Sequence, residues 1–434
     1  MLRVRFMLNA QMKGVSVKVR SGFFSILIGV VLLSPTVLYG IVNICKVDVP
    51  SAFTAQDASW LTGGIARAQV RENLSLDAFE EGRFQSSIEK AVGNYVPAKA
   101  SVLLGNAAVQ RMFISASNAI FEWECYPTYY GSTKLYLPSH FALAEMPMLD
   151  ETKVISSSDL ENGLMEFGAS LAKVASRHPD KNFWVVLADR TSTSRANPAF
   201  DLVSNKLSTE DCGEIMQRQI EGCSNVSVTV KAYDNAADYY RCFYPSDHHW
   251  NGFGALDATE RIGRPGVSSI TKEPSPSVSF GELFFNGTLS RRGLLCLNLT
   301  PIIEPAFNVE NLVVGEESAS YFKYMFDENG REELERQGLR AEYNFYGEWY
   351  GGDRDVLISN TSETAKGKAL LICDSYGDAF RWAIAGQYGE LGCEMKLKQA
   401  SYTAADLESW IAGNDSKDIY LVGWAGNFAH LKAK

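Results

Sequence analysis

The stretch that decides the fold is Lys368–Tyr388, which reads KALLICDSYGDAFRWAIAGQY. Its first six residues, Lys368–Cys373, form a short apolar run of the kind that fills a strand buried on both faces. The residues Ala379–Tyr388 have the character of a helix. Asp374 and Ser375 stand between the two, where the strand gives way to the helix. A side chain at such a turn is exposed next to the helix N-terminus, whose N–H groups favour negative charge.

The same alternation of strand and helix recurs on both sides of this stretch. Apolar strands are predicted at Asn182–Asp189, Val226–Ala232, Met395–Gln399 and Asp418–Trp424, and helices at Leu160–Ser176, Leu202–Ile220 and Ala255–Ile262. This order is typical of an α/β protein with a mostly parallel sheet and helices on both faces. Ligands of such sheets bind at the carboxyl ends of the strands, where Ser375 is expected to lie.

The N-terminal part of the chain has a different composition. Residues 1–20 carry five basic residues and no acid, and Phe23–Ile44 contains no charged residue. An apolar run of this length can cross a hydrocarbon core of roughly 30 Å, and the basic flank predicts a cytoplasmic N-terminus. A cleaved signal peptide is the alternative, although no small-x-small site follows the run. We therefore predict a single-pass protein of the cell membrane with these parts: cytoplasmic tail 1–20, transmembrane anchor 21–45, stalk 46–70 and extracytoplasmic domain 71–434.

The bulk composition excludes some classes of function. The 434 residues have a net charge of −10, which argues against broad nucleic-acid binding, because such proteins usually present a basic face. The eight cysteines include no C-x-x-C pair, so structural zinc is not expected. No cofactor and no metal are predicted.

A second motif, Asp247-His248-His249-Trp250, offers an acid and a base. Residues i and i+2 of an extended backbone point the same way, so Asp247 could reach the His249 imidazole and fix its tautomer. His248 is then expected to point away. A serine hydroxyl is a poor nucleophile until a positioned histidine takes its proton, so this motif and Ser375 together could perform acyl transfer.

Simpler interpretations exist for both motifs. Asp374 and Ser375 could only cap the helix that follows them. Asp247 and His249 could form a metal site or a hydrogen-bonded loop pair, although no other histidine has ligand spacing with them.

Five blocks of the chain carry a resemblance to a known family. In order they are FEEGRFQSSIEKAVGNYVPAKASVLLGN, DHHW, FFNGTLSRRGL, YGEWYGGDRDVLISN and KALLICDSYGDAF. This order resembles the DHHW family of bacterial SGNH-hydrolase-like proteins, which are related to the alginate O-acetyltransferases AlgJ and AlgX. The resemblance runs from about Ser75 to the C-terminus. It implies an SGNH-like fold in which Asp247 orients, His249 is the base and Ser375 attacks.

The chain departs from the wider SGNH pattern in two places. Cys373 stands where many SGNH proteins have glycine, and the asparagine-bearing oxyanion block is not identifiable. Asn427 is a candidate for that role or else a surface loop residue, and backbone N–H groups of Ser375 and its neighbours could serve instead. Two further residues are candidates for substrate contact. Trp250 either packs on the base loop or stacks on a sugar ring, and Arg190 either meets an anionic substrate or forms a salt bridge.

The resemblance leads us to expect an O-acetyltransferase. It would move an acetyl group through an acyl-serine to hydroxyls of a cell-envelope or exported polysaccharide. A membrane-bound O-acyltransferase would be the partner that brings acetyl groups across the bilayer. A carbohydrate acetylesterase is one alternative, because water could take the acyl group. A polysaccharide-binding or assembly protein without catalysis is another.

Overall fold

The structure of this chain is a computed structural model. It describes residues 79, 105–106, 109, 112, 125–130, 133–138, 149–150, 155–190, 193–196, 200, 207–244, 247–262, 275–284, 301–307, 309, 311–315, 317–318, 346, 350, 355–399 and 401–432. The predicted tail, membrane anchor and stalk lie outside these residues. Within the described ranges, no helix combines the length and apolar character that a membrane span requires.

The centre of the fold is a sheet with the strand order β5-β4-β14-β11-β12-β10-β8-β9. Its strands are β4 (Asn182–Ala188), β5 (Val226–Lys231), β8 (Leu312–Val314), β9 (Glu317–Ser318), β10 (Val356–Asn360), β11 (Lys368–Cys373), β12 (Glu390–Glu394) and β14 (Asp418–Trp424). The strands from β5 to β12 in this order pair in parallel, and β10, β8 and β9 continue the sheet antiparallel. The predicted α/β class with a mostly parallel sheet is therefore confirmed.

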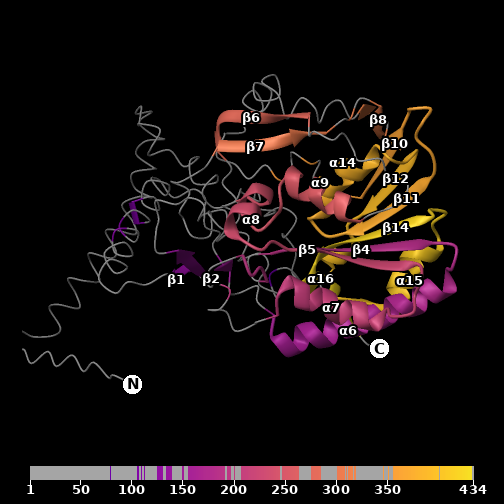
Figure 1. Ribbon diagram of the computed structural model, residues 1–434, viewed down its shortest axis with the longest axis horizontal. Helices are drawn as coiled ribbons and strands as arrows, with labels where there is room; N and C mark the ends of the chain where they lie inside the picture. Colours follow the sequence, from indigo (N-terminus) through magenta and orange to yellow (C-terminus); the bar gives the residue numbers. More distant parts are fainter. Residues whose placement is uncertain are drawn as a thin grey trace, which may run out of the picture. The chain divides into compact units, whose positions relative to one another are not determined.

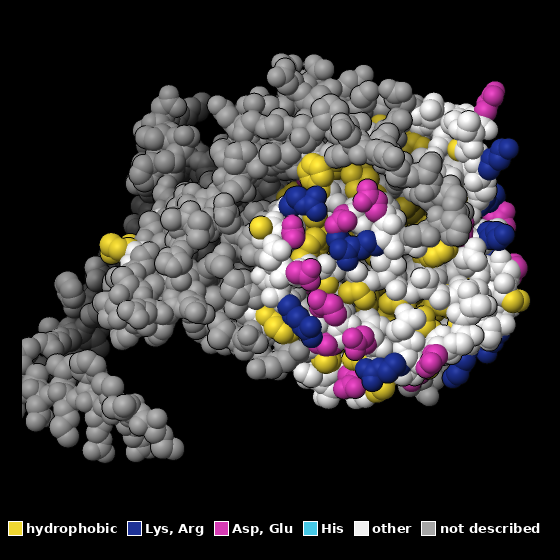
Figure 2. Space-filling view, in the orientation of Figure 1, with side chains coloured by type: hydrophobic (Ala, Val, Ile, Leu, Met, Phe, Trp, Pro, Cys, Tyr) yellow, Lys and Arg dark blue, Asp and Glu magenta, His cyan; other side chains and the backbone are white. Residues whose placement is uncertain are grey.

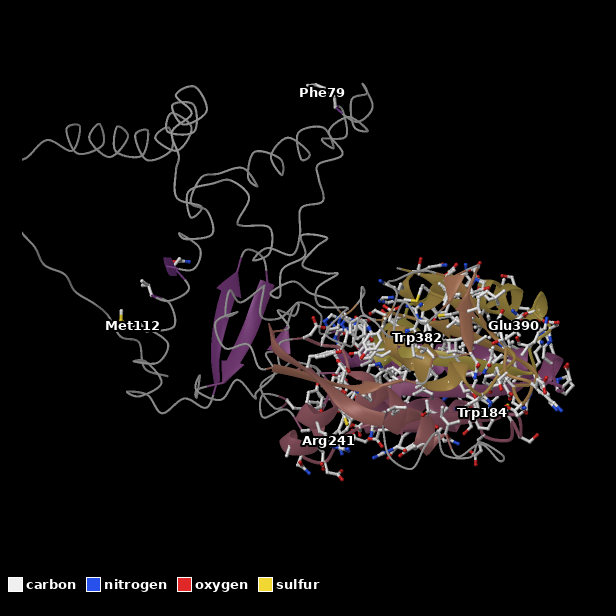
Figure 3. The ribbon with its side chains drawn as sticks, turned by 90° about the horizontal axis from the view of Figure 1, so that it is seen from above. Phe79, Met112, Trp184, Arg241, Trp382 and Glu390 are labelled. Carbon is white, nitrogen blue, oxygen red and sulfur yellow. The ribbon has the colours of Figure 1, made fainter. Side chains whose placement is uncertain are left out.

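Helices cover both faces of this sheet (Figure 1). One face carries α6 (Ser157–Arg177), α7 (Thr209–Gln219), α15 (Ala404–Ala412) and α16 (Ala425–Phe428). The opposite face carries α8 (Ala236–Cys242), α9 (Gly252–Arg261) and α14 (Gly377–Ala385). Figure 3 shows Trp184 of β4, Trp382 of α14 and Glu390 of β12 within one body of side chains, while Arg241 of α8 lies at its margin.

The sequence of β11 fits its place between two layers of helices. Ala369, Leu371 and Cys373 pack toward α9 and α14, whereas Leu370 and Ile372 pack toward α6 and α15. All five side chains are buried. Fully burying one leucine or isoleucine contributes about 1.5–3 kcal/mol, so this strand is apolar throughout rather than at alternate positions.

The helices begin at polar capping residues. Ser208 and Thr403 each form a reciprocal capping box, at the start of α7 and α15. Asn251 caps α9 by accepting a hydrogen bond from the backbone of Gly254. This cap ends the Asp247–Trp250 motif and fixes where α9 starts.

Smaller elements complete the described chain. They are the antiparallel strands β1 (Cys125–Tyr130), β2 (Thr133–Pro138) and β3 (Leu149–Asp150), the antiparallel pair β6 (Ser275–Phe284) and β7 (Pro301–Ala306), the parallel pair β13 (Tyr402–Thr403) and β15 (Leu431–Lys432), and the 3-10 turn η5 (Lys396–Lys398). The predicted strand at Met395–Gln399 is wrong. The strand ends at Glu394 because the Met395 N–H donates to the carboxylate of Asp355 at 2.7 Å and leaves the ladder.

The candidate site lies at the ends of three neighbouring parallel strands. The strands β4, β14 and β11 lie side by side, so their carboxyl ends meet at one edge of the sheet. The residues that follow or close these strands there are Arg190, Trp424 and Ser375. This edge is where an open α/β sheet binds its ligands.

Candidate active site

Ser375 lies in the turn between β11 and α14. The turn is tight, since the Gly377 N–H donates to the carbonyl oxygen of Asp374 at 2.9 Å. A Cβ atom on Gly377 would lie 2.1 Å from the Sγ of Cys373, so this position has room only for glycine. Tyr376 is the N-cap of α14 and makes no side-chain capping bond. The Ser375 hydroxyl is therefore not used as a helix cap.

The Asp247–His249 segment sits in a narrow loop before α9. Phe243 and Trp250 form an antiparallel bridge across the base of the loop. Within it, the Tyr244 N–H donates to the His249 carbonyl oxygen at 3.3 Å, and the Asp247 N–H donates to the Tyr244 carbonyl oxygen at 3.2 Å. These backbone hydrogen bonds fix the positions of Asp247 and His249 relative to each other.

The structure brings Asp247, His249 and Ser375 together in one chain of hydrogen bonds. His249 Nδ1 lies 2.6 Å from Asp247 Oδ1, and His249 Nε2 lies 2.7 Å from Ser375 Oγ. A carboxylate can only accept, so we assign the imidazole proton to Nδ1. Nε2 is then free to accept the Ser375 proton. At these distances His249 could take the proton of Ser375, and Asp247 could orient His249.

The expectation that His248 points away from Asp247 is wrong. Its Nδ1 lies 3.3 Å from the same Asp247 oxygen, and its ring centroid lies 3.9 Å from that of His249. The loop is bent here rather than extended, so consecutive side chains do not alternate. The His248 carbonyl oxygen also accepts a hydrogen bond from the Tyr376 hydroxyl at 2.5 Å.

Asp374 fixes the turn that carries Ser375. Its Oδ1 accepts the N–H of Tyr376 at 2.8 Å, and its Oδ2 accepts the N–H of Trp424 at 3.1 Å and the Nδ2–H of Asn427 at 2.8 Å. Burial raises the pKa of Asp374, and these three donors act against that rise. In this structure Asn427 thus holds Asp374, which ties the end of β11 to the end of β14.

Tyr346 is a site residue that the sequence analysis did not single out. Its ring stacks on the His249 imidazole with centroids 4.1 Å apart and planes 11° apart. Its hydroxyl donates to the Ser375 carbonyl oxygen at 2.9 Å. The only signal in the sequence was its place at the start of the YGEWYGG block, because no local pattern links it to a base about a hundred residues earlier.

Trp250 is packed inside the protein. Its side chain is 0% exposed, its Nε1–H donates to the Tyr376 carbonyl oxygen at 2.9 Å, and its ring stacks on Phe380 with centroids 6.2 Å apart. Of the two interpretations of Trp250, packing on the base loop is therefore the one observed, because a ring without exposed surface cannot stack on a sugar. The residue instead ties the base loop to the turn of the nucleophile.

Arg190 follows β4 at the same edge of the sheet. Its guanidinium lies 4.3 Å from the ring centroid of Trp424, and the residue is 8% exposed. None of the ion pairs among the residues that the structure describes includes Arg190, so the salt bridge considered for it is not observed there. The partner of the Arg190 guanidinium is the ring of Trp424, through a cation–π contact, and not a carboxylate.

One face of the described part of the chain carries charge of both signs. Figure 2 shows Lys and Arg side chains interspersed with Asp and Glu across the described part of one face. Such a mixed surface gives no strong field on that face.

The backbone N–H of Ser375 is a candidate donor for an oxyanion. Among the described residues, the Ser375 backbone N–H makes no hydrogen bond, although the neighbouring N–H groups of Asp374 and Tyr376 do. Free N–H groups at this point can stabilise the negative oxygen of a tetrahedral intermediate.

The loop could alternatively bind a cation, since ligand atoms of Asp247, His248 and His249 lie within 4.8 Å of one another. Both ring nitrogens of His249 are already engaged, which favours the acid–base interpretation.

No family model and no curated protein matches the chain. Among solved structures it is similar to a DHHW family protein from Eubacterium siraeum, with 13% identity, a TM-score of 0.45, and 70% of this chain and 92% of that chain covered. It is also similar to Bacillus cereus PatB1, with 12% identity, a TM-score of 0.42, and coverage of 70% and 97%. The O-acetyltransferase domain of Pseudomonas putida AlgJ gives 10% identity, a TM-score of 0.34, and coverage of 71% and 94%. The first is a DHHW family protein, as the resemblance of the sequence led us to expect, and each likeness is a distant one.

Proposed function

We propose that this chain is a serine-dependent O-acyltransferase that moves an acetyl group to a hydroxyl of a cell-envelope or exported polysaccharide. The observation that carries the proposal is the unbroken hydrogen-bond chain from Asp247 through His249 to Ser375. The choice of acetyl and of a polysaccharide rests on the resemblance of the sequence to the DHHW family.

The first half-reaction forms an acyl-serine. His249 Nε2 takes the proton of Ser375 Oγ, which attacks the carbonyl carbon of the acetyl donor. The Ser375 N–H stabilises the negative oxygen of the tetrahedral intermediate. Collapse of the intermediate breaks the bond to the donor, which leaves with the proton from His249. Asp247 stabilises the imidazolium between the two proton transfers.

The second half-reaction uses the same groups in reverse. His249 removes a proton from a sugar hydroxyl, whose oxygen attacks the acetyl carbon of the acyl-serine. Collapse returns the proton to Ser375 Oγ and releases the acetylated glycan. We propose that Arg190, which is held by Trp424 at this edge, meets an anionic group of the substrate.

The cellular setting is part of the proposal. The apolar segment at 21–45 would anchor the chain in the cell membrane, with the domain at 71–434 outside the cytoplasm. A membrane-bound O-acyltransferase would then be the partner that supplies acetyl groups from the cytoplasmic side.

Intact-mass spectrometry tests the nucleophile. The full-length chain is exposed to 4-nitrophenyl acetate in three forms: wild type, Ser375→Ala, and Ser409→Ala as a control at an exposed serine of α15. We expect one acetyl adduct that peptide mapping places on Ser375, present in the control and absent from Ser375→Ala. A folded wild type without an adduct would contradict the proposal and favour a binding protein.

Product analysis separates the two catalytic possibilities. The acetylated wild type is mixed with an oligosaccharide acceptor, and acetyl transfer is compared with acetate release. Transfer that exceeds release supports an acyltransferase, whereas acetate release alone would make the protein an esterase.

A further inference from the structure

We propose that Glu304 is a positioning residue that holds the base loop and His249 in reach of Ser375. Glu304 lies in β7, is 0% exposed and takes no part in the proton transfers. Its Oε1 accepts the hydroxyl proton of Tyr244, and its Oε2 accepts the hydroxyl of Tyr350 at 2.8 Å and the N–H of Gly252 at 2.9 Å. The inference rests on the proposed function only in that His249 is taken as the base.

The first connection runs through Tyr244. The backbone of this residue pairs with the loop in both directions, since its N–H donates to His249 and its carbonyl oxygen accepts from Asp247. Tyr244 is therefore held at both ends, by Glu304 at its hydroxyl and by the loop at its backbone. A shift of the Tyr244 side chain would also shift the backbone of Asp247 and His249.

The second connection runs through the aromatic rings over the base. Tyr350 packs edge-on against Tyr346 with centroids 5.2 Å apart, and Tyr244 packs edge-on against the same ring at 6.0 Å. Tyr346 in turn stacks on His249. Both tyrosines that donate to Glu304 thus support the ring that covers the imidazole.

The third connection fixes the start of α9. Gly252 lies three residues after His249 and is the first residue of α9. The first N–H groups of a helix have no acceptor within the helix, and the N–H of Gly252 donates to Glu304. A Cβ atom on Gly252 would lie 2.6 Å from the ring of Pro305, so β7 and α9 are in direct contact at this point. Glu304 therefore ties three segments of the chain around the loop.

The ionised form of Glu304 suits this task. A carboxylate offers acceptors to all three donors, while a protonated carboxyl must turn one oxygen into a donor. No Lys, Arg or His of the described residues pairs with Glu304, and the titratable groups that face it are Tyr244 and Tyr350. Burial raises its pKa to about 7, which the three hydrogen bonds oppose. Protonation below this range would remove one bond from the network.

The test compares Glu304→Gln with wild type and with Glu363→Gln, a control at an exposed glutamate. Full-length protein in detergent is acylated by 4-nitrophenyl acetate, and the single-turnover rate is followed from about pH 5 to pH 8. In wild type the rate should gain from the deprotonation of Glu304 near pH 7, a gain that Glu304→Gln lacks. We therefore expect Glu304→Gln to be roughly tenfold to a hundredfold slower than wild type at pH 8, and the two rates to approach each other toward pH 5. A contribution to folding alone would lower the rate by the same factor at every pH.

A second measurement does not depend on acyl transfer. Diethyl pyrocarbonate modifies free imidazole, and peptide mapping reports the rate at His249, which is only 7% exposed. We expect this rate to rise severalfold in Glu304→Gln, while the rate at His178 stays unchanged. Tyr350→Phe, which removes one donor, replaces Glu304→Gln if that variant does not fold and should show a smaller rise.

The outcomes separate the two proposals. If wild type is not acylated but His249 becomes more reactive in Glu304→Gln, the proposed function fails and the positioning role stands. If Glu304→Gln matches the control in the pH dependence of acylation and in His249 modification, the positioning role is overturned, whatever the fate of the proposed function.

Discussion

Replacing Asp247 by asparagine tests the core of the proposed mechanism. The Asp247 side chain is 0% exposed, and its Oδ1 accepts the Nδ1–H of His249 at 2.6 Å and the backbone N–H of His249 at 3.1 Å. Asparagine has nearly the same shape, and its one carbonyl oxygen can keep both hydrogen bonds. The fold should therefore survive. What the variant loses is the negative charge beside His249 when the imidazole takes the Ser375 proton.

The size of the loss follows from the distance between the charges. The contact between the two atoms is 2.6 Å, but each charge is spread over its group, so the charge centres are about 4 Å apart. At an effective dielectric constant of about 20, unit charges at that distance attract by about 4 kcal/mol. Each 1.36 kcal/mol is tenfold in rate, so we expect acylation of Ser375 to slow about a thousandfold.

The assay is the single-turnover release of 4-nitrophenolate from 4-nitrophenyl acetate, with the adduct mapped to Ser375. His248→Gln is the matched control, because the Nδ1 of His248 lies 3.3 Å from the same Asp247 oxygen, while the hydroxyl of Ser375 is hydrogen-bonded to His249. We expect the control to lose less than about tenfold. A loss below about tenfold in Asp247→Asn, or an equal loss in both variants, would refute the assignment of Asp247 as the residue that supports the base.

Three further variants probe the surroundings of the site. Asn427→Ala removes the 2.8 Å bond to the buried Asp374, and a charge-assisted bond of about 1.5 kcal/mol or more predicts roughly tenfold slower acylation; an unchanged rate would show that Asp374 holds the turn without it. Tyr346→Phe keeps the stack on His249 and loses the hydroxyl bond to Ser375, so its acylation rate should fall about two- to tenfold, less than in Tyr346→Leu; equal losses would argue against the stack. Asp189 is fully buried, and burial raises its pKa to about 7, above its value of 3.8 in the unfolded chain. Its contribution to stability is therefore fully present below about pH 3.8 and is lost as the pH rises from there to about 7. The melting temperature of wild type should fall between these two pH values. Asp189→Asn keeps an oxygen for the Arg190 N–H and the Thr209 hydroxyl and should flatten this fall, and an unaltered pH profile would contradict the raised pKa.

Much of the scaffold could be predicted from local patterns. The strand Lys368–Cys373 has the predicted bounds, because a six-residue apolar run between polar neighbours satisfies its backbone only between two other strands. The error at Met395–Gln399 has a non-local cause. Asp355, about forty residues earlier, takes the N–H that the strand would have needed.

Some residues of the candidate site could likewise be named from the sequence, and others could not. Asp247, His249 and Ser375 could be named in advance because their residue types and order match a known family, and because a turn after a buried strand exposes its side chain. Asp374, Tyr346 and Glu304 could not be assigned, since each acts through partners far away in the chain. Two roles were open for Trp250, and the choice depends on its burial against Tyr376 and Phe380, which lie more than a hundred residues on.

The sequence by itself determined the class of fold, the edge of the sheet where Ser375 lies, and the residue types available for acyl transfer. Those features follow from backbone hydrogen bonding and from the burial of apolar side chains, which leave periodic patterns along the chain. Only the tertiary structure decided that His249 meets Ser375 at 2.7 Å, that His248 shares the oxygen of Asp247, and that a buried carboxyl in β7 supports the loop. The physical reason is range: a hydrogen bond between side chains 126 residues apart depends on how every strand and helix between them packs, and no local pattern records that packing.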